Sequence, residues 1–174
     1  MRTLGRLIVV LAAAFGGLTA SQLPEFAQQY RQRLGGALAE LSRIVSEFEA
    51  DAARNRLTRD EAVRTYTTSI ETFLRDQGVS VTGTLSRQER LAEQRARLES
   101  APPIMRPVVM LSHTDETVMR GAWTDFEPAV PVTSAGFVWA AIGFFLLGGI
   151  VSMLRQLIGI WRRRARTRRL QPEA

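Results

Sequence analysis

The chain contains no cysteine, no lysine and a single histidine among its 174 residues. Without cysteine it can form neither a disulfide nor a thiolate metal site, so packing alone must hold it together. The one histidine lies in Ser112-His113-Thr114-Asp115, and neighbours in sequence cannot reach the geometry of a catalytic triad. Phosphate loops, G-x-S-x-G, H-E-x-x-H and EF-hand patterns are also missing. We therefore expect no enzymatic activity, no bound metal and no cofactor.

Acidic side chains are almost absent from both ends of the chain. None occurs before residue 25, and only Glu173 occurs after residue 134. The formal net charge is +6, yet residues 24–134 hold 14 Arg and 16 acids, a net of −2. The excess positive charge therefore lies at the two ends, which favours membrane topology over nucleic-acid binding.

Charge is also missing from Ala135 to Leu154, which consists almost entirely of apolar and small residues. A helix of this length rises about 30 Å, roughly the thickness of one hydrocarbon core. We predict a transmembrane helix over residues 135–157, followed by a basic cytoplasmic tail over residues 158–174. Anionic lipid would attract the tail's arginines and anchor them at the membrane surface. These are Arg162, Arg163, Arg164, Arg166, Arg168 and Arg169.

A second apolar segment lies near the N-terminus, after Arg2 and Arg6. A basic head, an apolar stretch and Leu18-Thr19-Ala20 resemble a cleavable signal peptide. Leu18 is a poor match to the small residue that the cleavage site requires, and Leu4 to Leu23 is long enough to span a bilayer. We predict a retained transmembrane helix over residues 1–23.

Small residues recur at helical spacing in both apolar segments. This small-xxx-small pattern lets two helices in lipid approach closely, and it predicts a contact with a partner helix, such as this chain's own second span. The alternative is that Ala and Gly are simply common in apolar segments. The predicted contact residues are Ala12, Gly16, Ala20, Gly136, Ala140 and Gly148.

The middle of the chain, residues 24–134, is polar and strongly helical in pattern. Apolar residues at spacings of three and four predict helices over residues 26–53, 58–77 and 85–99. Thr58 and Glu61 form a predicted capping box, Gly78 is a predicted C-terminal cap, and residues 79–84 read as a connector. Glu47 and Asp51 share a helix face, which we expect to be solvated rather than metal-binding.

Two segments carry a resemblance to a known family. They are Ser21-Gln-Leu-Pro-Glu-Phe-Ala-Gln-Gln-Tyr-Arg-Gln-Arg-Leu-Gly-Gly36 and Trp123-Thr-Asp-Phe-Glu-Pro-Ala-Val-Pro-Val-Thr133. The chain resembles a proteobacterial family of uncharacterised two-span inner-membrane proteins, a domain of unknown function. The resemblance implies a location and an architecture, but no activity. The residues Gln28, Gln29, Tyr30 and Arg33 in the first segment are either an interaction surface or the solvated start of a long helix.

The predicted fold is all-α, with two transmembrane helices flanking an elongated antiparallel helical or coiled-coil bundle. Arginines flank both spans on the same side, which predicts cytoplasmic termini and a periplasmic middle in a bacterial inner membrane. The favoured function is a non-enzymatic scaffold or accessory subunit of an envelope complex, and the alternative is a homo-oligomeric pore or transport component. Expected partners are membrane lipid and a membrane protein or a second copy. Nucleic acid is not expected, because the basic tail lacks interleaved aromatic residues.

Overall fold

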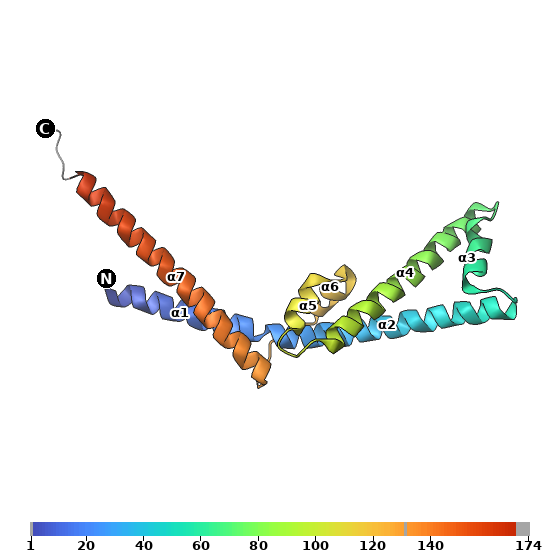
Figure 1. The fold of residues 1–174 in the computed structure, drawn as a ribbon, viewed down its shortest axis with the longest axis horizontal. Coiled ribbons are helices and arrows are strands. Elements are labelled where there is room, and N and C mark those ends of the chain that lie inside the picture. Colours follow the sequence, from blue (N-terminus) through green and yellow to red (C-terminus); the bar gives the residue numbers. More distant parts are fainter. Residues whose placement is uncertain (1, 131, 170–174) are drawn as a thin grey trace. The chain divides into compact units, whose positions relative to one another are not determined.

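All elements in the described part of the chain are α-helices, as the sequence predicts. The structure is a computed structural model that describes residues 2–130 and 132–169, with side chains for residues 3–130 and 132–161. The helices, drawn in Figure 1, are α1 (Arg2–Ser21), α2 (Leu23–Arg54), α3 (Arg59–Thr67), α4 (Thr72–Ser100), α5 (Arg106–Ser112), α6 (Glu116–Thr124) and α7 (Ser134–Arg169). They form two units, one from residues 26–126 and one from the residues on either side of that range.

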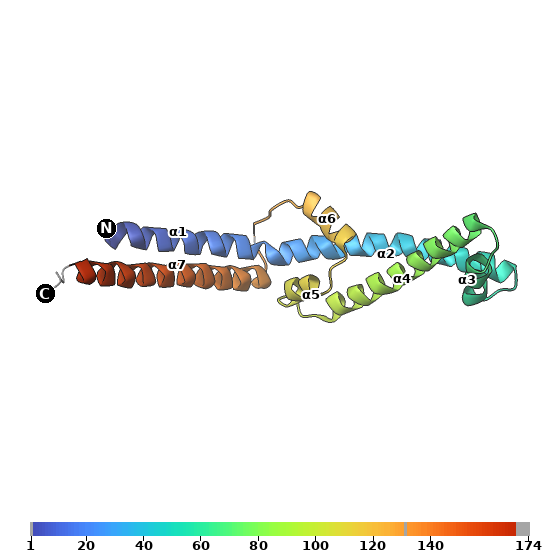
Figure 2. The same ribbon diagram turned by 90° about the horizontal axis from the view of Figure 1, so that it is seen from above.

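The first unit consists mainly of α1 and α7, which lie side by side and antiparallel (Figure 2). Both helices are long and apolar enough to cross a membrane, with mean hydropathies of 1.7 and 2.2 over their most apolar windows. Only 11% of each window is buried inside the protein, whereas the core helix of a soluble domain would be mostly covered. This exposure is consistent with membrane association.

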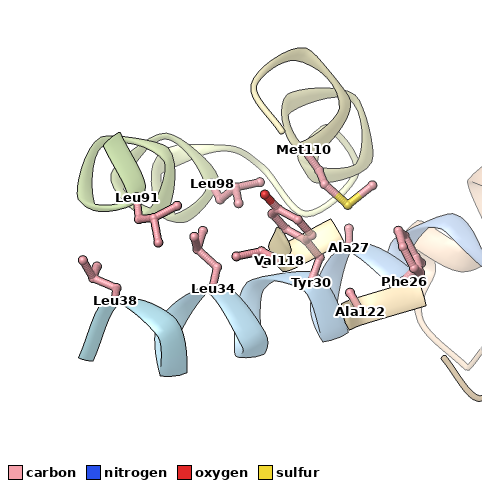
Figure 3. Close-up of a cluster of buried hydrophobic side chains, with 10 residues drawn as sticks. All are labelled: Phe26, Ala27, Tyr30, Leu34, Leu38, Leu91, Leu98, Met110, Val118 and Ala122. Atoms are coloured by element: carbon pink, nitrogen blue, oxygen red, sulfur yellow. The ribbon is translucent and has the colours of Figure 1, made fainter. Parts of the chain in front are cut away.

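The core of the second unit lies where α2 meets α4, α5 and α6 (Figure 3). Leu34 and Leu38 of α2 face Leu91 and Leu98 of α4, and all four side chains are buried. Tyr30 lies beside them and is completely inaccessible to solvent. The remaining buried members of this core are Phe26, Ala27, Met110, Val118 and Ala122.

The predicted capping box is confirmed at the start of α3. The Thr58 hydroxyl accepts a hydrogen bond from the Glu61 backbone N–H at 3.3 Å, and the Glu61 carboxylate accepts from the Thr58 N–H at 2.8 Å. These bonds satisfy backbone donors that a helix start leaves free. The Thr58 N–H and the Thr58 hydroxyl, which also donates to the carboxylate at 2.8 Å, lower the pKa of the Glu61 carboxyl below its ordinary value, because they favour its charged form.

The predicted connector over residues 79–84 is wrong, because α4 runs through it without a break. The hydroxyls of Ser80, Thr82 and Thr84 each donate to the carbonyl four residues earlier, so they bond within the helix instead of competing with it. The helix is interrupted earlier, between Thr67 and Thr72, and the Ile70 side chain in this interruption is 95% exposed.

Gly78 is not a C-terminal cap, because it lies inside α4 and under α3. A Cβ at Gly78 would come within 2.8 Å of Thr67 Cγ2 and 3.0 Å of Tyr66 Cβ. The absence of a side chain at this position therefore permits the close approach of α3 to α4.

Candidate functional site

The contact between α1 and α7 is made by small residues, as their spacing predicts. Gly16 and Gly143 meet backbone to backbone: a Cβ on Gly16 would lie 2.5 Å from the Gly143 carbonyl oxygen and 2.6 Å from Leu147 Cβ. Further along this line of contact between α1 and α7, here called the seam, a Cβ on Gly148 would lie 2.8 Å from Ala13 Cβ. Only hydrogen fits at these positions, so the two helices pack at the shortest separation that their backbones allow.

The predicted contact residues lie in or beside this seam to different degrees. Gly16, Gly136 and Gly148 are buried, whereas Ala12, Ala20 and Ala140 are half-buried. Ala20 Cβ lies opposite Gly143, and the Ala140 carbonyl lies opposite Gly17. Gly143, which meets Gly16 and Ala20, is missing from the predicted set. The register of an antiparallel pair fixes which small residues meet, and spacing within one helix does not reveal it.

Polar contacts close the helix pair at both ends. Near the C-terminal end of α1, Gln22 and the Ala129 backbone exchange two hydrogen bonds, each 3.1 Å long. Near its N-terminal end, Arg155 of α7 donates to the Gly5 carbonyl. A Cβ on Gly5 would lie within 2.6 Å of Arg155 Cζ, so the guanidinium rests directly on the glycine. These contacts hold the two helices in one register.

The four residues of the possible interaction surface do not share one exposed face. Tyr30 is wholly buried, so its assignment to a surface is wrong: its ring fills the core between α2, α4 and α6. Gln28 and Arg33 are exposed, and Arg33 forms an ion pair with Asp125. Gln29 is half-buried and has an interaction partner. The helical period places Tyr30 on the apolar face of α2. Because the tyrosine side chain carries a hydroxyl group, it can be mistaken for a surface residue when the sequence alone is read.

The Tyr30 hydroxyl links three segments of the second unit. It accepts hydrogen bonds from the Gln94 side-chain amide at 2.7 Å and from the Asp115 backbone N–H at 3.1 Å. Burial raises the pKa of the Tyr30 phenol above its ordinary value, and the two hydrogen-bond donors partly offset this rise. Gln94 is buried and also donates to the His113 carbonyl. The sequence pattern gave no reason to expect this buried polar contact.

His113 lies at the edge of an open cleft of about 510 Å³ between α4 and the start of α6. Its Nδ1 lies 3.0 Å from the Ser112 hydroxyl oxygen, and its Nε2 faces the Arg97 guanidinium. Arg97 can only donate, so Nε2 accepts and Nδ1 carries the proton. The Ser112 hydroxyl already donates to the Val109 carbonyl at 2.9 Å. In this arrangement His113 is a hydrogen-bond donor to the Ser112 hydroxyl.

The acidic pair on α2 is neutralised by arginine. Glu47 pairs with Arg43 at 2.5 Å, and Asp51 pairs with Arg54. Among the residues that the structure describes, no cluster of three or more His, Cys, Asp or Glu side chains is arranged to hold a metal ion. The arginine side chains of the predicted membrane-surface anchor, residues 162–169, lie outside the described side chains, although their backbone continues α7.

Comparison with known families identifies the chain at the level of its family. Residues 4–164 match the family described as "Protein of unknown function (DUF2937)". The chain belongs to this family. The match covers α1 and extends far into α7, so both apolar helices and the whole helical middle are parts of the family's architecture. No curated protein and no solved structure matches the chain.

Proposed function

We propose that this protein is a non-enzymatic scaffold or accessory subunit of a bacterial inner-membrane or envelope complex. In this proposal α1 and α7 cross the bilayer, both termini are cytoplasmic and residues 24–134 are periplasmic. The packing of Gly16 against Gly143 carries the proposal, because it joins two apolar helices into a hairpin without any polar core. Such packing substitutes for the hydrophobic effect, which does not drive helix association in lipid.

The outer faces of the hairpin support its insertion into lipid. Leu11, Phe15 and Leu18 of α1 and Phe145 of α7 are all at least 60% exposed. An apolar surface of this size is unfavourable in water, and a hydrocarbon environment would cover it. Arginines before α1's apolar segment and after that of α7 favour the cytoplasmic side for both ends.

The second unit supports a role in partner binding. In the segment between α3 and α4 and the first turns of α4, Ile70, Phe73 and Val79 are 95%, 69% and 70% exposed. Exposed apolar side chains of this kind often mark protein–protein contacts. The pore alternative requires the faces that carry Gly16 and Gly148 to associate between copies. Within one chain, however, Gly16 already packs against Gly143, and Gly148 packs against Ala13.

Cross-linking in intact membranes tests the proposal. A photo-reactive residue at Phe73 is expected to give a discrete adduct with another membrane or envelope protein, identified by mass spectrometry after mild detergent extraction. The same residue at the exposed position Ala50 on α2 is the matched control. A protein that remains monomeric and free of adducts from both positions, and under every extraction condition, would contradict a scaffold function.

A further inference from the structure

At the end of the α1–α7 pair where α1 begins, the two helices line an open cleft of about 780 Å³. Its polar side chains are Arg6 from α1 and Ser152, Arg155 and Gln156 from α7. The distance along each helix from the Gly16–Gly143 contact to its arginine is similar. Arg6 is ten residues from Gly16, and Arg155 is twelve residues from Gly143, which corresponds to about 15 Å and 18 Å along the helices. Both guanidinium groups therefore stand at nearly the same level of the hairpin.

The positive charge of this cleft has no acidic counterpart in the same unit's helices. No Asp or Glu occurs before residue 25 or between residues 128 and 172. Arg155 donates to the Gly5 carbonyl, which is a neutral acceptor, and no described acid pairs with Arg6. Two guanidinium groups near one another at the end of an apolar helix pair attract an anion, and Ser152 and Gln156 add further donors.

The walls of the cleft are apolar on the side towards the middle of the hairpin. Val9 and Val10 continue α1 from Arg6 towards Gly16, whereas Ile160 of α7 lies beyond Arg155, towards the C-terminal end of that helix. Gly159 also lines the cleft, and a Cβ built on it would meet no atom within 4 Å, so the space beside it is open. A ligand that fills this site must combine an anionic group with an apolar part.

From this combination we infer that the cleft between α1 and α7 binds the headgroup of an anionic phospholipid. The phosphate lies between Arg6 and Arg155, and the first part of an acyl chain follows Val9 and Val10 towards the hydrocarbon core. Basic pockets between membrane helices on the cytoplasmic side are suited to such headgroups. The inference rests on the proposed membrane-spanning arrangement. It names one lipid class and one binding place, whereas the basic tail would attract any anionic lipid at the membrane surface.

The test is native mass spectrometry of the full-length protein in detergent, with added phosphatidylglycerol or with phosphatidylcholine of the same acyl chains. We expect one tightly bound phosphatidylglycerol per chain. Neutralisation by Arg6→Gln or Arg155→Gln is expected to weaken this binding about fivefold each, and by roughly 25-fold together. Equal binding of the two lipids would overturn the inference.

A second variant separates the cleft from the general charge of the protein. Gly159→Leu fills the open space without changing charge, and it is expected to reduce phosphatidylglycerol binding about fivefold, as much as the loss of one arginine. Gly149→Leu is the matched control, because a Cβ at Gly149 also meets nothing within 4 Å but lies outside the cleft. Equal lipid binding by both variants, or equal loss in both, would contradict a site in the cleft.

Two further arms identify the source of the anion and separate this inference from the proposed function. Inorganic phosphate at millimolar concentration is expected to leave bound phosphatidylglycerol in place, and displacement would show a soluble-anion site instead. Alkaline washing of protein-containing vesicles tests membrane insertion itself. Loss of the protein from the vesicles would refute the proposed function, whereas an inserted protein without lipid preference would refute only the cleft.

Discussion

The substitution Gly143→Ala tests the helix seam most sharply, because it adds a single methyl group where two backbones touch. That Cβ would lie 2.5 Å from Ala20 Cβ, about 0.9 Å short of the 3.4 Å at which ordinary contact begins. It would also press against the backbone of Gly16, which cannot rotate away as a side chain can. The helices must therefore separate, and overpacking of this kind costs about 1–3 kcal/mol.

The matched control is Gly149→Ala, also on α7, where an added Cβ meets nothing within 4 Å. Both full-length variants are unfolded by increasing the SDS concentration in mixed micelles, and unfolding is monitored by tryptophan fluorescence and circular dichroism. We expect Gly143→Ala to unfold at lower SDS with a loss of about 1–3 kcal/mol, and Gly149→Ala to stay within about 0.5 kcal/mol of the parent. Equal stability of the two variants would refute the backbone-to-backbone contact.

Four other expectations follow from individual contacts. Tyr30→Phe removes the acceptor of two hydrogen bonds and should lower the free energy of unfolding by about 1–3 kcal/mol, whereas Tyr66→Phe should have little effect. Because folding raises the pKa of Tyr30, its contribution is complete below the ordinary value of 10.0 and is lost as the pH rises above it, so the parent should lose more stability than Tyr30→Phe in alkaline thermal unfolding. Thr58→Ala should destabilise the protein by about 1 kcal/mol in the same measurement, because it removes the side-chain half of the capping box. The pair Gly17→Cys with Phe144→Cys should oxidise to an intramolecular disulfide in the otherwise cysteine-free chain, since the two Cβ positions lie 3.4 Å apart, and failure to form it would place α1 and α7 in a different register.

Local signals in the sequence predicted much of the helical architecture. The capping box at Thr58 marks a real helix start, because it depends on chemistry within a few residues. The apolar spacing of three and four likewise predicted the helix over residues 26–53, which lies within α2. Such features require no knowledge of which helix lies opposite.

The errors arose where a distant contact decides the local structure. Gly78 and the hydroxyl-rich residues after it resemble a helix end, yet α3 covers Gly78 and each hydroxyl bonds within α4. The break occurs instead after Thr67, so Ile70 and Phe73 are exposed rather than packed on the predicted apolar face. Tyr30 and Gly143 were misjudged or missed for the same reason, because their environments come from segments far away in the chain.

The direct test of the central claim is the side of the membrane on which each end of the helix pair lies. Because the chain has no cysteine, Ser80→Cys and Glu173→Cys each provide a single thiol for a membrane-impermeant maleimide. The account predicts that spheroplasts label Ser80→Cys at once, and Glu173→Cys only after the membrane is permeabilised. Labelling of Glu173→Cys in sealed spheroplasts, with Ser80→Cys protected, would contradict it.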